Sequence, residues 1–149
     1  MGIKVIIMLK RKAGMTPEAF RHEYENGHSR LGLKYMGHLW SSYKRNYLGP
    51  ANSFAAGSIP TEGGAETNAG YDVITEIVYK DMAAVEESNR IASDPEFKRL
   101  IQEDEARLFD RVNCLIMPCE VVGEDDLDYD WKDWKRDDPT YKAPRRKAR

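Results

Sequence analysis

Cysteine and histidine are both scarce in this chain of 149 residues, which holds two cysteines and three histidines. Cys114 and Cys119 are separated by an odd interval, so on a regular strand their side chains point to opposite faces and cannot form a disulfide, although a bulge at Pro118 would alter that parity. Two thiols and three scattered histidines lack the spacing of a zinc site. We therefore expect no metal site.

Long apolar runs are also missing. None approaches the roughly 20 residues that a membrane-spanning helix needs. In the N-terminal segment MGIKVIIMLKRK the basic residues follow the apolar run, which is the reverse of a secretory signal. The formal net charge of −2 gives no reason to expect nucleic acid as a partner. The sequence thus predicts a cytoplasmic protein without membrane or nucleic-acid partners.

A histidine lies on the apolar face of the first predicted helix. Thr16 followed by Pro17 is a helix-start signal, because the hydroxyl can cap a backbone N–H and proline fits the first turn. Spacings of four, four and three then place four side chains on one face: Phe20, Tyr24, His28 and Leu31. Two interpretations stand: a core histidine with a satisfied hydrogen bond, or an acid–base group at the floor of a pocket.

The last predicted helix repeats this anomaly with a carboxylate. Its apolar stripe consists of Phe97, Leu100, Ile101 and Leu108. Asp104 lies within that stripe, one turn from Leu100 and from Leu108. A buried carboxylate without a partner is costly, so we expect Asp104 to have one, and His28 is a candidate.

The order of the predicted elements indicates the fold class. Strands are expected at 3–9, 39–48, 71–79 and 112–122, and helices from 17 to 32 or 37, at 82–91 and at 95–111. This order predicts an α+β, ferredoxin-like split βαβ fold, in which helices cover one face of a four-stranded antiparallel sheet. Residues 50–70 have no periodicity and are interpreted either as a lid or as an insertion.

Three of the predicted strands are apolar on both faces, although the helices can cover only one. The uncovered face requires another surface, and a second copy of the chain is the simplest. We therefore expect a domain over residues 1–122 that forms a homodimer sheet to sheet. A charged tail at 123–149 follows, either extended or docked on the partner subunit.

Four segments carry a family resemblance: IKVIIMLKRKAGMTPEAFRHEYENGHSRL, YKRNYLGP, YDVITEIVY and DPEFKRLIQEDEARLFD. They resemble the EthD-type family of the dimeric α+β barrel superfamily, over about the first 122 residues. The chain has Ser29 and Arg30 where the family usually carries a proline. The resemblance implies a small cofactor-free protein that acts on hydrophobic, often aromatic or polyketide-like compounds. It aligns His28 with the histidine of the family.

Our first hypothesis is an isomerase or lyase of a catabolic or secondary-metabolite pathway, which would catalyse a dehydration, decarboxylation or cyclisation of an oxygenated substrate. His28 would be the general acid or base, and Asp104 would fix its tautomer. Candidate substrate-binding residues are Tyr24, Trp40, Tyr43, Arg45 and Tyr47. Arg45 would bind a substrate carboxylate, unless it is solvated or pairs with Asp104. The alternatives are a carrier of a hydrophobic metabolite, a cofactor-free monooxygenase, and a haem- or heavy-metal-binding protein.

Overall fold

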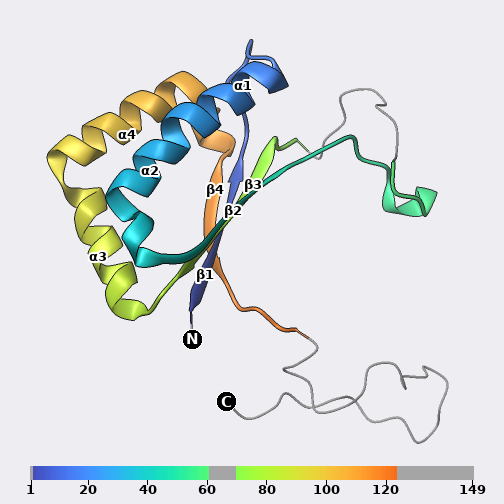
Figure 1. Ribbon diagram of the computed structural model, residues 1–149. Helices are drawn as coiled ribbons and strands as arrows, with labels where there is room; N and C mark the ends of the chain where they lie inside the picture. Colours follow the sequence, from blue (N-terminus) through green and yellow to red (C-terminus); the bar gives the residue numbers. More distant parts are fainter. Residues whose placement is uncertain (1, 61–69, 124–149) are drawn as a thin grey trace, which may run out of the picture. The chain divides into compact units, whose positions relative to one another are not determined.

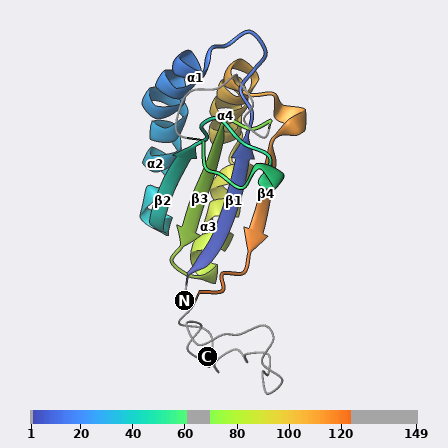
Figure 2. The same cartoon turned by 90° about the vertical axis from the view of Figure 1, so that its right-hand side faces the viewer.

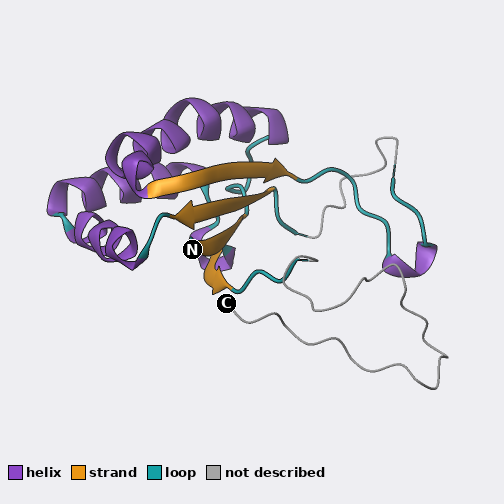
Figure 3. Cartoon of the chain, turned by 60° about the horizontal axis from the view of Figure 1, so that its bottom comes forward, coloured by secondary structure: helices purple, strands orange, loops and turns teal. Residues whose placement is uncertain are grey.

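The computed structural model describes residues 2–60 and 70–123. Its strands are β1 (Ile3–Leu9), β2 (Trp40–Tyr47), β3 (Val73–Tyr79) and β4 (Leu115–Cys119). Its α-helices are α1 (Pro17–Glu23), α2 (Ser29–Met36), α3 (Met82–Ser93) and α4 (Pro95–Leu108). The strands form one antiparallel sheet in the order β2-β3-β1-β4, and the α-helices cover one of its faces (Figures 1 and 3). The predicted ferredoxin-like fold is confirmed.

The first helix differs from a regular α-helix in its middle turn. It runs from α1 into α2 through a π-helix, η1 (Tyr24–His28), in which the Ser29 N–H donates to the Tyr24 carbonyl five residues earlier. A π turn adds one residue, so the apolar face shifts by one position beyond it. Ser29 is consequently 2% exposed, whereas Leu31, which regular spacing assigns to the core, is only half-buried.

The ends of this helix follow the sequence more closely. The Thr16 hydroxyl accepts a hydrogen bond from the Ala19 N–H at 3.1 Å, and Pro17 occupies the first turn. The helix continues through Ser29 and Arg30 to Met36, and neither of these two residues is a proline that would remove a backbone N–H. The observed end lies within the predicted bounds.

The connection after α4 differs from the prediction. α4 ends at Leu108 rather than at residue 111, and β4 is shorter than the predicted 112–122. Phe109 leaves the helix because it forms an antiparallel bridge with Arg11, which backbone hydrogen bonds flank on both sides. A single 3-10 turn, η4 (Arg111–Asn113), then leads into β4. The residues after α4 are thereby held beside the end of β1.

Strand β2 contains an irregularity that changes which side chains share a face. Regular alternation puts Trp40 and Tyr43 on opposite faces. The pairing with β3 shifts register between Trp40 and Ser42, so that both aromatic rings lie on the same side, with centroids 4.9 Å apart. Regular alternation along the strand therefore assigns Trp40 to the wrong face.

The face of the sheet away from the helices is turned toward the viewer in Figure 2, and it carries both apolar and charged side chains. The strand register places six apolar side chains on it: Ile6, Met8, Ile74, Val78, Leu115 and Met117. Lys4 and Glu76 form an ion pair there, and Asn46 donates to Glu76 at 2.9 Å. We call this surface the open face. It fits the sequence-based expectation that β1, β3 and β4 are apolar on both sides.

Residues up to Cys119 form one compact unit. No helix in the described ranges is long and apolar enough to cross a membrane. Residues 124–149 of the predicted tail, which was expected to begin at residue 123, and the middle of the predicted loop, 61–69, lie outside the described residues. The proposed lid and the docked tail therefore stay predictions.

Candidate functional site

A pocket of about 300 Å³ lies between the helices and the β1–β4 side of the sheet. Its walls carry both apolar and polar groups and come from β1, η1, α4, β4 and the connection after α4. Its lining residues are Ile7, Leu9, Tyr24, His28, Glu105, Phe109, Arg111, Cys114, Leu115 and Ile116. Volumes of this size are at the lower end of the range for small-molecule sites. We call this cavity the His28 pocket.

The imidazole of His28 is packed between aromatic rings. It stacks on Tyr24 with ring centroids 5.6 Å apart and an interplanar angle of 22°. Phe109 meets it edge-on at 5.0 Å. The side chain of His28 is 18% exposed. Its Nδ1 atom is fully buried and has no hydrogen-bond partner among the described residues.

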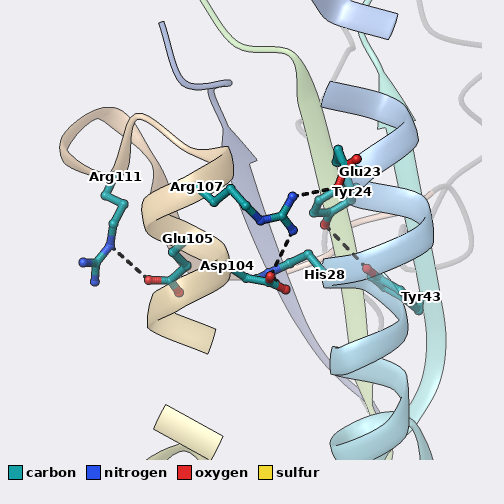
Figure 4. Close-up of polar contacts among 8 residues, drawn as sticks. All are labelled: Glu23, Tyr24, His28, Tyr43, Asp104, Glu105, Arg107 and Arg111. Carbon is teal, nitrogen blue, oxygen red and sulfur yellow. Dashed lines mark hydrogen bonds and ion pairs between the residues drawn. The ribbon is translucent and has the colours of Figure 1, made fainter. Parts of the chain in front are cut away.

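Asp104 faces this buried nitrogen without bonding to it. The Asp104 Oδ2 lies 3.6 Å from His28 Nδ1, which is longer than an ordinary hydrogen bond. The other oxygen of Asp104 accepts from Arg107 at 3.1 Å, and Arg107 also donates to Glu23 at 2.7 Å (Figure 4). His28 and Asp104 therefore lie close together, as the sequence analysis suggested, but the Asp104 carboxylate also pairs with Arg107.

The surroundings lower the pKa of His28 below its ordinary value. The main cause is burial, which disfavours the imidazolium ion, and the charge of Arg107 acts in the same direction. The carboxylate of Asp104 opposes this shift. The balance favours a neutral imidazole, which can accept a proton at neutral pH.

The His28 pocket holds a second charged pair that the sequence analysis missed. Arg111 and Glu105 form an ion pair, with 3.0 Å between Nε and Oε2, and both side chains line the pocket (Figure 4). Half of the Arg111 side chain is exposed, and no other ion pair occupies it within the described chain. Both residues lie in or just after the segment DEARLFD, so the family resemblance was the one signal that pointed to them.

Tyr24 is the one predicted substrate-binding residue that lines the His28 pocket. Its hydroxyl is hydrogen-bonded to Thr75 at 2.9 Å and lies 3.5 Å from that of Tyr43. Burial raises the pKa of Tyr24 well above its ordinary value, so this phenol stays protonated. Tyr24 can thus wall the pocket, while its hydroxyl is already engaged with the sheet.

The other predicted substrate-binding residues lie outside this pocket. Arg45 forms a two-point ion pair with Glu25, at 3.0 and 3.1 Å, and covers the ring of Tyr43. It does not pair with Asp104. Trp40 packs in a separate cluster around Met36 and Phe97.

Tyr47 lines a different pocket, of about 440 Å³, together with Arg11, Arg21 and Asp72. Burial raises the pKa of Tyr47 to about 12. The guanidinium of Arg21 lies 4.4 Å from the centre of its ring. This larger pocket contains no histidine, so we place the candidate site at the His28 pocket, which has an imidazole in its wall.

Comparison with known proteins shows the family. The family model for the EthD domain matches residues 12–112. The chain belongs to the EthD family. Comparison with curated protein sequences gives no match.

Solved structures share the fold of this EthD-family chain at low sequence identity. An ethyl tert-butyl ether D (EthD) family protein from Bacillus halodurans is 17% identical, with a TM-score of 0.53 over 82% of this chain and 100% of that one. A hypothetical protein from Arabidopsis thaliana is 16% identical, with a TM-score of 0.50 over 82% and 89%. A protein from Thermobifida fusca, described as dimeric and ferredoxin-like, is 13% identical, with a TM-score of 0.49 over 81% and 92%.

The described residues offer little support for metal binding or for a reactive thiol at the site. No three His, Cys, Asp or Glu side chains lie close enough together to hold a metal ion within residues 2–60 and 70–123. Cys114 lines the His28 pocket, but its sulfur accepts from the Lys10 N–H at 3.3 Å, and burial raises the pKa of the thiol. A protonated thiol is a weak nucleophile.

The lowered pKa of His28 predicts a pH dependence of folding stability. The unfolded chain binds more protons than the folded one between the ordinary pKa of 6.5 and the lower folded value. Stability therefore falls as the pH drops through that window, and His28→Gln removes this part of the fall. Urea denaturation between about pH 7.5 and pH 5 should show a smaller loss for the variant. Parallel losses of stability in the two proteins would contradict the prediction.

Proposed function

We propose that this EthD-family protein is a cofactor-independent enzyme that transfers a proton on a hydrophobic, oxygenated small molecule, with His28 as the general base. The observation that carries the proposal is an imidazole in the wall of a pocket with apolar and charged side chains, with its Nδ1 buried beside a carboxylate. An aromatic or polyketide-like substrate fits walls such as Leu9, Phe109 and Ile116. Dehydration, decarboxylation and cyclisation are reactions that this chemistry serves.

The orientation of His28 decides which nitrogen can act. Because Nδ1 is buried and faces Asp104, the favoured tautomer carries its proton there. The lone pair then resides on Nε2, which can abstract a proton from carbon or oxygen of the substrate. As the imidazolium forms, the Asp104 carboxylate stabilises its charge, and the 3.6 Å separation can shorten to hydrogen-bond length.

Arg111 supplies the opposite charge in the same pocket. Removal of a proton next to a carbonyl leaves negative charge on oxygen, and a guanidinium stabilises such an oxyanion. Arg111 engages Glu105 through Nε, so its terminal nitrogens can meet the substrate. This role differs from the one predicted for Arg45 from the sequence, which was to bind a substrate carboxylate.

Two other functions fit the same pocket. A carrier would bind the hydrophobic compound without changing it, and a cofactor-free monooxygenase would consume oxygen. The enzyme that we propose is distinguished from both by a product of unchanged oxidation state. Mass spectrometry of candidate ligands that raise the melting temperature, with and without oxygen, separates the three.

Substitution of the base tests the proposal directly. His28→Gln should lower kcat by roughly 10²- to 10⁴-fold, the usual contribution of a general base. The ligand-induced rise in melting temperature should persist, because the apolar walls remain. His38→Gln is the matched control, since His38 is exposed and outside the pocket. Full turnover by a folded His28→Gln protein would rule out the base.

Arg111→Met tests the second charge. Loss of the guanidinium should lower kcat by roughly 10²- to 10³-fold, because a stabilising group for the developing oxyanion is removed. Arg99→Met is the control, because Arg99 forms an exposed ion pair with Glu103 away from the His28 pocket. Equal kinetic constants for both variants would mean that Arg111 has no role in the reaction.

We also propose that the open face binds a second copy of the chain. Six apolar side chains surround the Lys4–Glu76 ion pair there, and no helix of the described chain covers them. A self-complementary patch of this kind suits a two-fold dimer. The helices stay on the outside of such a dimer, so the His28 pocket of each subunit keeps its own side of the sheet.

A charge in the middle of the open face should separate the subunits. Ile6 lies on the central strand β1, opposite Glu76 and Met117. Ile6→Lys should shift the protein from dimer to monomer in light scattering after size exclusion, with unchanged circular dichroism. Ile59→Lys is the control, because Ile59 is exposed and outside the sheet. A monomeric wild type at tens of micromolar would refute the proposal.

A further inference from the structure

Arg107 joins the two helices behind the His28 pocket without lining the pocket itself. One terminal nitrogen donates to Glu23, the last residue of α1, at 2.7 Å. The other donates to Asp104, one turn earlier on α4, at 3.1 Å. The guanidinium is planar and its donors are fixed relative to one another, so the two contacts fix its position. No step of the proposed reaction requires this residue.

We propose that Arg107 is a positioning residue, which holds the Asp104 carboxylate and thereby withholds it from His28 Nδ1. This inference rests on the proposed role of His28 as a base. The carboxylate has two oxygens, of which one is bonded to Arg107 and the other stops 3.6 Å short of the imidazole. A good charge-assisted contact between these groups would be about 2.8 Å long.

The consequence is a weaker hold of Asp104 on the protonated form of His28. A carboxylate that already neutralises a guanidinium attracts an imidazolium less strongly, and Arg107 repels that cation directly. Both effects favour the neutral base before the reaction. When His28 takes up a proton, Asp104 can turn toward it, while Glu23 retains Arg107.

The other groups near the imidazole are either uncharged or already paired, so they influence the protonation of His28 less than Asp104 and Arg107 do. Its own helix contributes Tyr24, whose phenol stays protonated, and β1 contributes the uncharged Ile7 and Leu9. The remaining groups on the pocket wall come from α4 and the segment after it: Glu105, Arg111 and Cys114. Glu105 and Arg111 are paired with each other, and Cys114 is bonded to Lys10, which leaves the Asp104–Arg107 pair as the adjustable charge.

Titration of the His28 imidazole by NMR tests the proposal without any substrate. Arg107→Gln should free Asp104 to accept from Nδ1, so the midpoint of His28 should rise relative to wild type. Signals of the three histidines are assigned with His28→Gln. In an assay of turnover, the acid limb of the kcat/KM profile should move to higher pH by the same interval. An unchanged midpoint in a folded variant would overturn the positioning role.

A second pair of measurements separates positioning from simple repulsion. If Arg107 acts through Asp104, the shift caused by Arg107→Gln should be much smaller in an Asp104→Asn background. Equal shifts in both backgrounds would mean direct repulsion and would overturn the proposal. Arg99→Gln, which breaks an exposed ion pair on the same helix, should leave His28 unshifted.

The conservative variant covers the case in which Arg107→Gln does not fold. Arg107→Lys keeps the charge but loses the two-pronged geometry, so it should raise the midpoint of His28 by a smaller interval. A titration midpoint equal to that of wild type would show that a positive charge alone has the effect. The two-point contact of the guanidinium would then have no positioning role. Because these titrations need no turnover, they stand or fall separately from the role of His28 as a base.

Discussion

The site depends on one carboxylate, Asp104, that can pair either with Arg107 or with the protonated form of His28. Asp104 lies between Arg107 and His28, and the bond to Arg107 is the shorter of the two contacts. Because Arg107 also reaches Glu23, this cluster ties α4 to the end of α1 across the top of the pocket. The aromatic packing beneath it, in which His28 stacks on Tyr24 and meets Phe109, then fixes the imidazole plane. His28 is therefore held both by the charges of Asp104 and Arg107 and by packing against Tyr24 and Phe109.

The π turn of the first helix makes this arrangement possible. Tyr24 and His28 remain stacked, as residues four apart on a helix can be, but the extra residue rotates the following turns. Ser29 then takes the buried position, and the helix continues to cover β2 and β3 through Met36. A regular helix would have to compromise between directing His28 at α4 and packing its second half on the sheet. Single π turns are common at functional sites for this reason.

Sequence periodicity was sufficient for what depends on neighbours along the chain. It predicted the cap at Thr16, the buried Phe20 and Tyr24, and the placement of His28 and Asp104 on facing helices. Spacing cannot identify partners that only the fold brings together. Glu25 pairs with Arg45 across the gap between helix and strand, and Arg107 competes for Asp104. The bulge at Trp40 and the π turn were not predicted either, because a single inserted residue produces no repeating pattern in the sequence.

The buried nitrogen of His28 also bears on the choice between enzyme and carrier. A pocket that only stores a hydrophobic compound gains nothing from an imidazole in its wall, since leucine or phenylalanine would fill the space without an unpaired polar atom. Burial of Nδ1 without a well-formed hydrogen bond is unfavourable for folding. The carboxylate that could satisfy it lies within 4 Å but is held by Arg107. A partner kept near but not engaged suits a group whose charge changes during a reaction, because its hydrogen bond can form when the proton arrives.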